Sequence, residues 1–274
     1  MKIKELQDRL SACGAQNPKA EAQIIIEQLF NVSYAAQLAD PKRDYPKNEL
    51  ENVIEKRKEH IPLQYILGKW EFMGKEFYVS PECLIPRPDT EILVEKALEI
   101  LKKGDDVADL CTGSGCIGLS VLMYGEPKTV TLMDISRGAL EMAEKNAKKH
   151  GVYDKCEFVL GDITKDMPRK QYDLILSNPP YIPTKDIEKL SSEVKKEPSL
   201  ALDGGDDGLD IIRFLVGDGL SYLKENGNML IEFGFDQEEQ MKALLEEKIN
   251  TGSIKSYKIL YDYGGNPRVA HISK

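Results

Sequence analysis

The chain has 274 residues, of which 41% are hydrophobic and 30% are charged, a composition typical of a water-soluble globular protein. No apolar run approaches the roughly 18 residues needed to span a bilayer, and the first residues lack the apolar core of a signal peptide. The sequence therefore predicts a cytoplasmic protein without a membrane partner. Its formal net charge of −9 argues against DNA as a partner, because proteins that bind duplex DNA usually present a basic face.

The first part of the chain, residues 1–75, is expected to fold as a small helical domain. Apolar residues recur at helical spacing within Ala20–Phe30, and a second apolar stripe begins at Leu50. The stretch Trp70–Val79 alternates aromatic and polar residues around a glycine, which is typical of a β-hairpin. We interpret this hairpin as a linker that ends near residue 85. Because the helical part carries no candidate catalytic residue, we expect it to dock a protein substrate.

The second domain, residues 86–274, alternates predicted helices with short apolar strands. Strands separated by helices form a parallel, doubly wound α/β sheet, and such sheets bind ligands beyond the carboxyl ends of their strands. The sequence therefore predicts a Rossmann-like sheet with its site at that edge. The expected strands cover residues 107–110, 130–133, 157–160, 172–176 and 228–233, and the expected helices cover residues 91–101, 117–123 and 139–149.

A glycine-rich loop follows the first predicted strand and reads DLCTGSGCIG over residues 109–118. Gly113 and Gly115 permit a tight turn and a close approach of a ligand to the backbone. Asp134 follows the second strand about 20 residues further on, where its carboxylate is placed to accept hydrogen bonds from two ribose hydroxyls. This pattern suits a nicotinamide dinucleotide as well as S-adenosylmethionine, so the loop alone leaves both open. The predicted cofactor contacts of this part are Cys111, Thr112, Gly113, Ser114, Gly115 and Asp134.

Asp162 and Ile163 follow the third predicted strand, at the same edge of the sheet. The carboxylate of Asp162 is able to accept a hydrogen bond from the exocyclic amine of adenine, while Ile163 packs on the face of the purine. An Asp after a strand is more often a helix cap, and this is the alternative interpretation. We assign both residues to the cofactor because they would supply the third ligand-compatible group at consecutive strand ends.

The phrase Asn178-Pro179-Pro180-Tyr181 directly follows the fourth predicted strand. An amide or aminopurine nitrogen is a poor nucleophile because its lone pair is delocalised. The side-chain oxygen of Asn178 and the backbone carbonyl of Pro179 are expected to accept hydrogen bonds from its two N–H groups and so direct the lone pair at a methyl sulfonium. The prolines fix φ and favour extended neighbours, which prepositions both acceptors.

This scheme needs no general base, since the methylated nitrogen becomes acidic and loses its proton readily. Catalysis then consists of alignment and electrostatic preorganisation. The alternative interpretation of the phrase is a proline turn. Tyr181 is expected to lie against the flat substrate group. The predicted catalytic residues are Asn178, Pro179 and Tyr181, the predicted substrate contacts are Asn178, Pro179, Pro180 and Tyr181, and Asn178 is also a predicted cofactor contact.

The phrase resembles the signature of methyltransferases that act on amino groups of adenine, cytosine or glutamine. Further stretches resemble the glutamine N5-methyltransferases of class 1 peptide chain release factors, and the similarity extends over nearly the whole chain. The resemblance implies a class I methyltransferase domain that uses S-adenosylmethionine to methylate the glutamine of the Gly-Gly-Gln motif in those factors. The stretches are PLQYILG at 62–68, WEF at 70–72, LIPRPDTE at 84–91 and NPR at 266–268.

Two positions depart from the pattern of this family. Cys111 stands where relatives commonly have glycine, although a side chain of this size should be tolerated. Ile163 stands where some relatives have an aromatic residue, which weakens the expected packing on adenine. Neither departure touches the catalytic phrase.

Other functions account for part of the sequence. An adenine-N6 DNA methyltransferase would flip its base towards the same phrase, but no basic target-recognition region is evident. Glutamine methyltransferases of ribosomal proteins share the phrase and usually differ after the Pro-Arg within residues 84–91. A nicotinamide oxidoreductase explains Asp134 and leaves residues 178–181 without a role. A non-catalytic binding module would be favoured if Asn178 or the glycines were replaced, and they are intact.

No metal site is expected. Cys111 and Cys116 have no second Cys or His pair nearby in the sequence. The loop at residues 203–208 reads DGGDDG, but it lacks the ligand set of a calcium loop and is interpreted as a turn. The five cysteines show no framework spacing, which favours reduced thiols.

Overall fold

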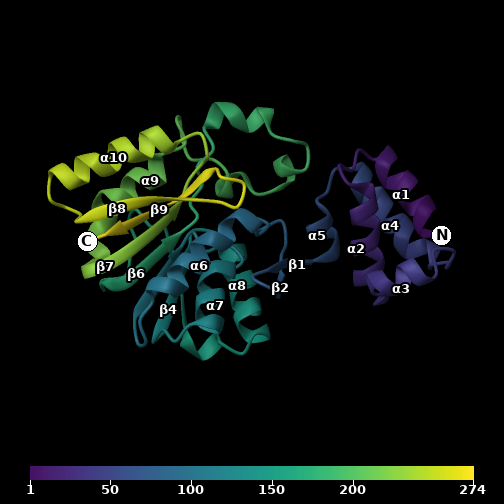
Figure 1. Ribbon diagram of the computed structural model, residues 1–274, viewed down its shortest axis with the longest axis horizontal. Coiled ribbons are helices and arrows are strands. Elements are labelled where there is room, and N and C mark those ends of the chain that lie inside the picture. Colours follow the sequence, from purple (N-terminus) through teal and green to yellow (C-terminus); the bar gives the residue numbers. More distant parts are fainter. The chain divides into compact units, whose positions relative to one another are not determined.

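The computed structural model describes residues 1–274, which form two compact units (Figure 1). Unit 1 comprises residues 1–70 together with 191–196, and unit 2 comprises residues 71–190 together with 197–274. None of the helices combines the length and the apolar character that crossing a bilayer would require.

Unit 1 is built of five α-helices. Apolar side chains from four of them meet in one core, in which Leu10, Ile25 and Ile54 are fully buried. The second helix begins where Asn17 accepts a hydrogen bond from the N–H of Ala20 at 3.1 Å, with a proline in its first turn, and both features favour a helix start. The helices are α1 (Ile3–Ala12), α2 (Pro18–Phe30), α3 (Tyr34–Ala39), α4 (Lys47–Lys58) and α5 (Leu63–Leu67).

A buried arginine holds the segment 191–196 in unit 1. Arg57 is 2% exposed, and its guanidinium donates two hydrogen bonds of 3.1 Å to the carboxylate of Glu21. It also donates to the carbonyl of Ile61 at 2.8 Å and to Glu193 at 2.7 Å. A buried charge of this kind is tolerated only when it is fully paired, so these contacts fix where residue 193 lies within the unit.

The predicted hairpin is present as strands β1 (Lys69–Phe72) and β2 (Lys75–Tyr78). Its turn residues Met73 and Gly74 have φ values of 51° and 66°. Positive φ at both central residues is typical of the two-residue turns whose twist matches that of the flanking strands.

The core of unit 2 is a seven-stranded sheet in the order β5-β4-β3-β6-β7-β9-β8. The first five strands in this order are parallel, and β9 runs antiparallel to both of its neighbours. The strand order reverses between β3 and β6, which is where doubly wound sheets bind ligands. The strands are β3 (Asp106–Leu110), β4 (Thr129–Asp134), β5 (Cys156–Leu160), β6 (Tyr172–Ser177), β7 (Leu223–Glu232), β8 (Ser256–Tyr261) and β9 (Pro267–Ser273).

The sheet has the expected doubly wound arrangement and adds two antiparallel pairings to its parallel part. The five predicted strands are present, but β8 and β9 were not anticipated, and β7 begins at Leu223 rather than at residue 228. Residues 224–226 are polar and largely solvent-facing, so they carry no apolar signal. Strand β8 lies at the edge of the sheet with several exposed residues, and β9 begins with Pro267, a residue that weakens any strand assignment.

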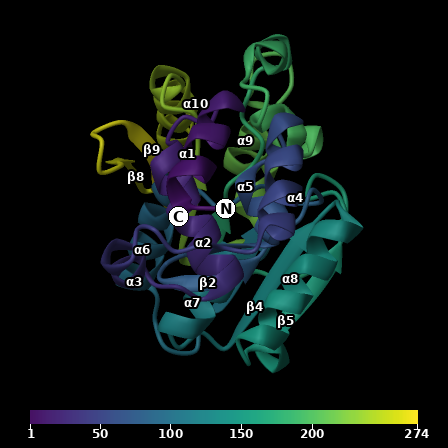
Figure 2. The same cartoon turned by 90° about the vertical axis from the view of Figure 1, so that its right-hand side faces the viewer.

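Helices cover both faces of this sheet. Alternate strand residues divide between two cores, with Val107 and Leu132 packing among α6 and α7, and Ala108 and Ile175 packing among α9 and α10. Figure 2 shows α8 running along β4 and β5. The helices are α6 (Glu91–Ile100), α7 (Cys116–Tyr124), α8 (Arg137–Lys149), α9 (Asp210–Val216) and α10 (Glu238–Asn250), with short 3₁₀ turns η1 (Pro88–Thr90), η2 (Tyr153–Lys155), η3 (Thr184–Lys189), η5 (Ser199–Ala201) and η6 (Asp218–Tyr222). The remaining 3₁₀ turn, η4 (Val194–Lys196), belongs to unit 1.

Candidate active site

A cavity of about 440 Å³ opens at the carboxyl ends of the parallel strands in unit 2. This volume lies within the range of small-molecule sites. The loops after β3, β4, β5 and β6 all contribute to its wall, as expected for a doubly wound sheet. Nine of the residues predicted from the sequence line it: Cys111, Thr112, Gly113, Ser114, Asp134, Asp162, Ile163, Asn178 and Pro180. The predicted residues Gly115, Pro179 and Tyr181 are not among the lining residues.

A buried carboxylate shapes the glycine loop. Asp109, at 0% exposure, accepts hydrogen bonds through one oxygen from the Thr112 hydroxyl at 2.6 Å and from the Gly118 N–H at 2.9 Å. A Cβ on Gly118 would lie 2.7 Å from Leu132 and 2.9 Å from the Asp109 side chain, so only glycine fits there. Burial raises the pKa of Asp109 to about 7.

The loop residues adopt backbone conformations that few side chains tolerate. Cys111, Gly113 and Gly115 have φ values of 59°, 55° and 80°. The left-handed region costs a residue with a Cβ roughly 1–2 kcal/mol, which is a reason for glycine at positions 113 and 115 and a cost that Cys111 bears. Gly115 is not among the cavity-lining residues. Its N–H donates to the carbonyl of Thr112 at 2.9 Å, and Gly115 is the N-cap residue of α7.

Asn146 supports the same loop from α8, a role that no sequence pattern indicated. Its amide donates to the carbonyls of Ser114 and Tyr78 at 2.9 Å each, and its oxygen accepts from the N–H of Tyr78 at 2.7 Å. The fully buried Asn146 thus joins the glycine loop to the hairpin strand β2. In the middle of a helix, no sequence pattern distinguishes an Asn that binds a neighbouring loop from an Asn that faces solvent.

Asp134 connects the glycine loop to the cavity. One carboxylate oxygen accepts from the N–H of Gly113 at 2.8 Å, and the other accepts from the N–H of Ser136 at 2.9 Å. Burial raises the pKa of Asp134, an effect that these backbone donors oppose. Because a carboxylate has about four acceptor sites, Asp134 retains capacity for a ligand hydroxyl beside its backbone donors.

Asp162 forms a local turn while it lines the cavity, and no helix begins at this residue. One oxygen accepts from the N–H and the hydroxyl of Thr164, at 2.9 and 2.7 Å, and the other pairs with Lys165 at 2.7 Å. Hydrogen bonds from Lys165 and Thr164 lower the pKa of Asp162 to about 2. The next residue, Ile163, is 4% exposed and belongs to the core beneath the cavity. Their contacts to adenine stay a prediction.

Asn178 presents a free acceptor at the cavity. Its side-chain nitrogen donates to the Thr90 hydroxyl at 3.2 Å, whereas its side-chain oxygen is buried and has no hydrogen-bond partner. Buried polar atoms are rarely left unpaired in native proteins, and the exceptions are often functional. The oxygen is therefore a candidate acceptor for a substrate N–H in this wall, where the hydroxyl oxygen of Ser114 is also buried and unpaired.

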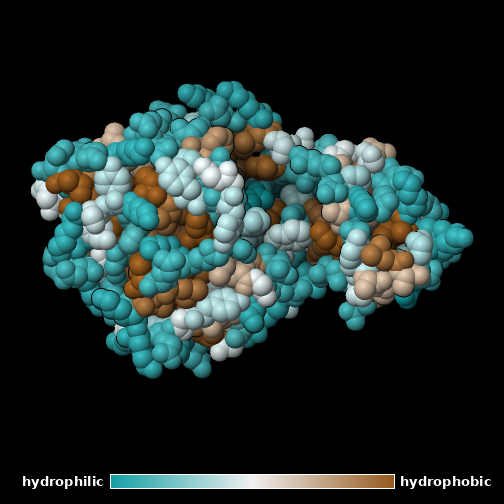
Figure 3. All heavy atoms as spheres, viewed as in Figure 1, coloured by the Kyte–Doolittle hydropathy of each residue, from teal (hydrophilic) through white to brown (hydrophobic).

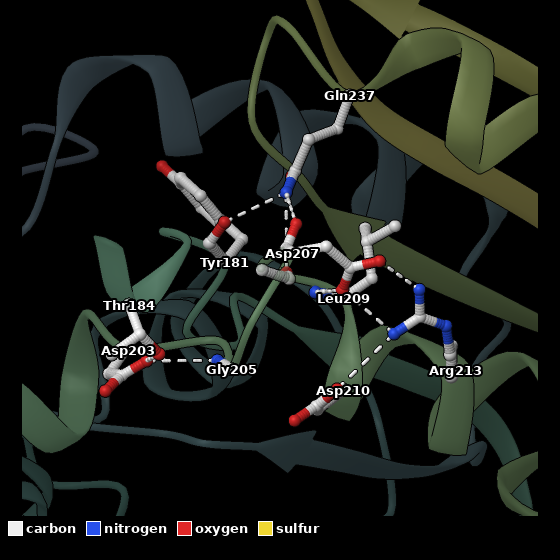
Figure 4. A network of polar contacts seen from close by, with 10 residues as sticks. Tyr181, Thr184, Asp203, Gly205, Asp207, Leu209, Asp210, Arg213 and Gln237 are labelled. Carbon is white, nitrogen blue, oxygen red and sulfur yellow. Dashed lines mark hydrogen bonds and ion pairs between the residues drawn. The ribbon is translucent and has the colours of Figure 1, made fainter. Parts of the chain in front are cut away.

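Tyr181 points into the protein rather than lining the cavity. Its hydroxyl donates to the carboxylate of Glu232 at 3.3 Å, and its ring packs against the core. Its backbone carbonyl accepts from the side chain of Gln237 at 2.9 Å (Figure 4). The stacking of Tyr181 on a substrate group stays a prediction, whereas its hydrogen bonds anchor the segment 178–181 to Glu232 and Gln237.

The Asp-Gly loop, residues 203–208, packs against the catalytic phrase (Figure 4). Asp203 lines the cavity and accepts hydrogen bonds from the Thr184 hydroxyl at 2.7 Å and the Gly205 N–H at 3.0 Å. A Cβ on Gly208 would lie 2.2 Å from the carbonyl of Tyr181. The loop is thus a tightly packed turn at the cavity rim, as the sequence indicated.

The loops before α6 and around η5 supply residues that the sequence singled out only as part of a resemblance. Arg87 lines the cavity and forms an ion pair with Glu197, which is 6% exposed. The second oxygen of Glu197 accepts from the N–H of Ile85 at 3.0 Å. Thr90 also lines the cavity and contacts Asn178. The only signal for Arg87 and Thr90 was their place in the stretch at 84–91, and Glu197 lies outside that stretch.

The sheet order, the glycine loop after its first strand and the acidic residues after the next two strands define a class I methyltransferase. Comparison with known proteins agrees: the family model for the methyltransferase small domain matches residues 88–197, and that for the PrmC N-terminal domain matches residues 3–68. A ribosomal protein L11 methylase from Lactobacillus delbrueckii subsp. bulgaricus has a similar fold, with a TM-score of 0.51 and 23% identity over 72% of this chain and 83% of that one. A methyltransferase from Pyrococcus furiosus gives a TM-score of 0.56 and 20% identity over 74% and 89%.

Relatives at higher identity define the family. The release factor glutamine methyltransferase of Moorella thermoacetica is 37% identical over 265 residues, which is 95% of this chain and 93% of that protein. The release factor glutamine methyltransferase of Aquifex aeolicus is 34% identical over 274 residues, covering 98% and 94%. The chain belongs to the release factor glutamine methyltransferase family.

Asp109→Asn is expected to remove a pH dependence of stability. The pKa of Asp109 is about 7 in the folded chain, whereas that of an unfolded Asp is roughly 3.9. Between these values the folded chain binds a proton that the unfolded chain does not, so this group's contribution to the free energy of unfolding falls as the pH rises from about 4 to about 7. Denaturant unfolding of parent and variant at pH 4.5 and 7.5 measures this. The parent should lose stability relative to the variant at the higher pH, and an unchanged difference would contradict the assignment.

Proposed function

We propose that this chain transfers the methyl group of S-adenosylmethionine to the N5 amide nitrogen of the glutamine in the Gly-Gly-Gln motif of class 1 peptide chain release factors. The observation that carries the proposal is the Asn178 carboxamide, whose nitrogen is held by Thr90 and whose buried oxygen is left free at the cavity. Membership of the release factor glutamine methyltransferase family supports the same substrate.

The cavity fits S-adenosylmethionine better than a nicotinamide dinucleotide. Four carboxylates line it, and its single cationic side chain, Arg87, is already paired with Glu197. Such a wall disfavours the two phosphates of a dinucleotide and favours a cationic sulfonium, because like charges repel strongly where water is excluded. When bound, S-adenosylmethionine supplies an electrophilic methyl group. The carboxylates belong to Glu82, Asp134, Asp162 and Asp203.

Different residues around the cavity are assigned to different parts of S-adenosylmethionine. Asp134 is placed to accept hydrogen bonds from ribose hydroxyls, and the positive φ of Gly113 allows close approach to the backbone. Ile163 offers an apolar contact for adenine, and Asp162 lies beside it. Cys111, Thr112 and Ser114 complete this wall, with Asn178 at the end where the methyl group would lie.

Thiols near the site do not compete for the methyl group. Burial raises the pKa of Cys83 to about 11, and it raises the pKa of Cys111 and Cys116 further. A thiolate, not a thiol, is the nucleophile, so these three side chains stay inert at neutral pH. The substrate amide is then the reactive partner that the site selects.

Asn178 and Pro179 act on the nucleophile. The oxygen of Asn178 and the carbonyl of Pro179 accept the two N–H bonds of the substrate amide, which aligns its lone pair with the methyl carbon. The two prolines restrict the backbone of this phrase. Asn178 lines the cavity, whereas Pro179 is not among its lining residues and stays the predicted second acceptor. The nitrogen loses a proton after methyl transfer, and no side chain is assigned as a base.

Unit 1 is proposed to dock the release factor, with residues 1–75 as the docking domain, the hairpin as its linker to about residue 85 and residues 86–274 as the methyltransferase domain. Hydrophobic atoms reach the surface of unit 1 among hydrophilic ones (Figure 3). Leu38 on α3 is 61% exposed, and Tyr34 on the same helix is 48% exposed. The proposal also places the enzyme in the cytoplasm without a DNA substrate. The net charge of −9 and five free cysteines support this.

The direct test incubates the enzyme with labelled S-adenosylmethionine and, in separate reactions, a class 1 release factor, a ribosomal protein and duplex DNA. Mass spectrometry of the Gly-Gly-Gln peptide should find one added methyl group on the glutamine. Label in DNA or the ribosomal protein, with none in the release factor, would replace the proposal by one of the other functions.

Asp134→Ala is expected to weaken the binding of S-adenosylmethionine by about 2–4 kcal/mol, because two ribose hydrogen bonds are lost. Isothermal calorimetry measures the change, with Asp154→Ala as the control, since Asp154 is an exposed carboxylate outside the cavity. Tight binding of NAD to the parent enzyme, without heat from S-adenosylmethionine, would reject the cofactor.

Asn178→Ala is expected to lower kcat by two to three decades while the cofactor still binds, because a preorganised hydrogen bond to the reacting group is worth about 2–4 kcal/mol. Asn178→Asp keeps an acceptor oxygen and should retain more activity than Asn178→Ala. Single-turnover methylation of the release factor gives both rates. The control is Asn250→Ala, at the exposed end of α10. Parent-like turnover in Asn178→Ala would show that the catalytic centre lies elsewhere.

Leu38→Glu is expected to raise KM for the release factor about tenfold and leave kcat and cofactor affinity unchanged, since a charge is placed in an apolar contact. Gln28→Glu adds the same charge at an exposed polar position of α2 and is the matched control. Equal KM values for both variants would remove this surface from the docking role.

A further inference from the structure

Two buried polar side chains, Thr90 and Glu232, lie behind the Asn178 carboxamide, and the proposed reaction gives them no role. The Asn178 nitrogen donates to the Thr90 hydroxyl at 3.2 Å, and Thr90 is 2% exposed. The Thr90 hydroxyl also lowers the pKa of the Glu232 carboxylate at the carboxyl end of β7, and one oxygen of this carboxylate has no hydrogen-bond partner. Glu232 is 1% exposed and also accepts from Tyr181 at 3.3 Å. Thr90 and Tyr181 thus connect the two ends of the segment 178–181 to one buried acid, Glu232.

The direction of hydrogen bonding along this chain decides which end of the Asn178 amide faces the substrate. An amide has two nearly isosteric orientations, one presenting oxygen and the other presenting NH₂. Only the oxygen is able to accept from the NH₂ group of a glutamine substrate. A hydroxyl that donates to a carboxylate has only its lone pairs left, so Thr90 then accepts from the Asn178 nitrogen and excludes the flipped amide.

We propose that Thr90 and Glu232 are positioning residues for methyl transfer: ionised Glu232 orients the Thr90 hydroxyl, and Thr90 orients the Asn178 carboxamide so that its oxygen faces the substrate amide. This inference rests on the proposed function, because it assigns Asn178 the role of an acceptor in the reaction. Neither Thr90 nor Glu232 touches the reacting atoms in this scheme.

The surroundings of Glu232 place its pKa close to neutral pH. Burial raises the pKa of Glu232 to about 7, and interactions with Thr90, Arg268 and Tyr181 oppose this rise. Arg268 on β9 supplies the nearby positive charge and is itself paired with Asp262 at 3.2 Å. The remaining charged or titratable neighbours are Asp89 on η1, which raises the pKa of Glu232, and Cys116 on α7, which burial keeps as a neutral thiol.

A change in the protonation of Glu232 therefore has a consequence for the rate. A protonated Glu232 is able to donate to Thr90, whose hydrogen is then free to point at the Asn178 side chain and stabilise the flipped amide. The folded pKa lies above the ordinary value, so the ionised form is lost as the pH falls through about 7. The parent kcat should accordingly decrease on the acid side of pH 7.

The first experiment replaces Thr90 in the full-length enzyme. Thr90→Val removes the hydroxyl at constant shape and should lower kcat for release factor methylation about 10- to 100-fold, the range expected when a reacting group is misplaced. KM for the release factor and the calorimetric affinity for S-adenosylmethionine should change little. Thr90→Ser keeps the hydroxyl and should restore most of kcat. Thr131→Val is the matched control, because Thr131 is a buried threonine on β4 that donates to Glu157 at 2.9 Å, away from the cavity.

The second experiment replaces the acid. Glu232→Gln should lower kcat at pH 8 and abolish the decrease in kcat between pH 8 and pH 6, because the titrating group is gone. Glu157→Gln, the partner of Thr131, is the control and should keep the parent pH profile. A merely structural role of Glu232 would lower stability without removing the acid limb.

Each outcome decides the proposal. Parent-like kcat in Thr90→Val, or an unchanged acid limb in Glu232→Gln, would overturn it, as would equal losses in Thr90→Val and Thr90→Ser. If Thr90→Val fails to fold, as judged by its melting curve, the pH profile of Glu232→Gln alone supports or overturns the proposal. If the parent enzyme itself leaves the release factor unmethylated, the proposed function fails, whereas a methylating parent with an active Thr90→Val variant sinks only this inference.

Discussion

The site depends on the pairing of one strand, β3, with a parallel neighbour on each side. Leu110, the last residue of β3, is opposite Met133 of β4 and Ser177 of β6, and the Ser177 hydroxyl donates to the Leu110 carbonyl at 2.8 Å. Because the register is fixed along the whole strand, the residues that follow all emerge at one edge. A shift by one residue would turn each buried strand side chain to the opposite face, so the hydrophobic cores on both sides of the sheet protect the geometry of the cavity.

Sequence periodicity was sufficient for the buried part of this fold. The central parallel strands are continuous apolar runs between helices, and their carboxyl ends carry Asp134, Asp162 and Asn178, which do meet at one cavity. Strands β8 and β9 escaped detection because edge position, polar residues and a leading proline weaken the apolar signal on which such predictions depend.

The contacts that hold the cavity-lining residues in place could not be predicted from the sequence, for a different reason. Glu232, Asn146 and Thr90 act through tertiary contacts with residues 51, 32 and 88 positions away in the chain. No local pattern encodes such a partner, and an acid at the end of a strand is compatible with many roles. Tyr181 illustrates this limit. The sequence shows that it follows Pro180, but no local pattern indicates that its hydroxyl donates to the buried carboxylate of Glu232.

A shared physical feature links the buried acids to the free oxygen of Asn178. Leaving a buried acceptor unpaired costs roughly 1–3 kcal/mol, and holding Asp109 and Glu232 in a low-polarity environment adds a cost that appears as their raised pKa values. The surrounding cores supply the stability that tolerates these costs. A substrate amide that donates to Asn178 removes the first cost on binding, whereas a group without N–H donors does not. The unpaired oxygen of Asn178 therefore favours a ligand that carries an N–H donor, and the amide of a glutamine side chain is such a ligand.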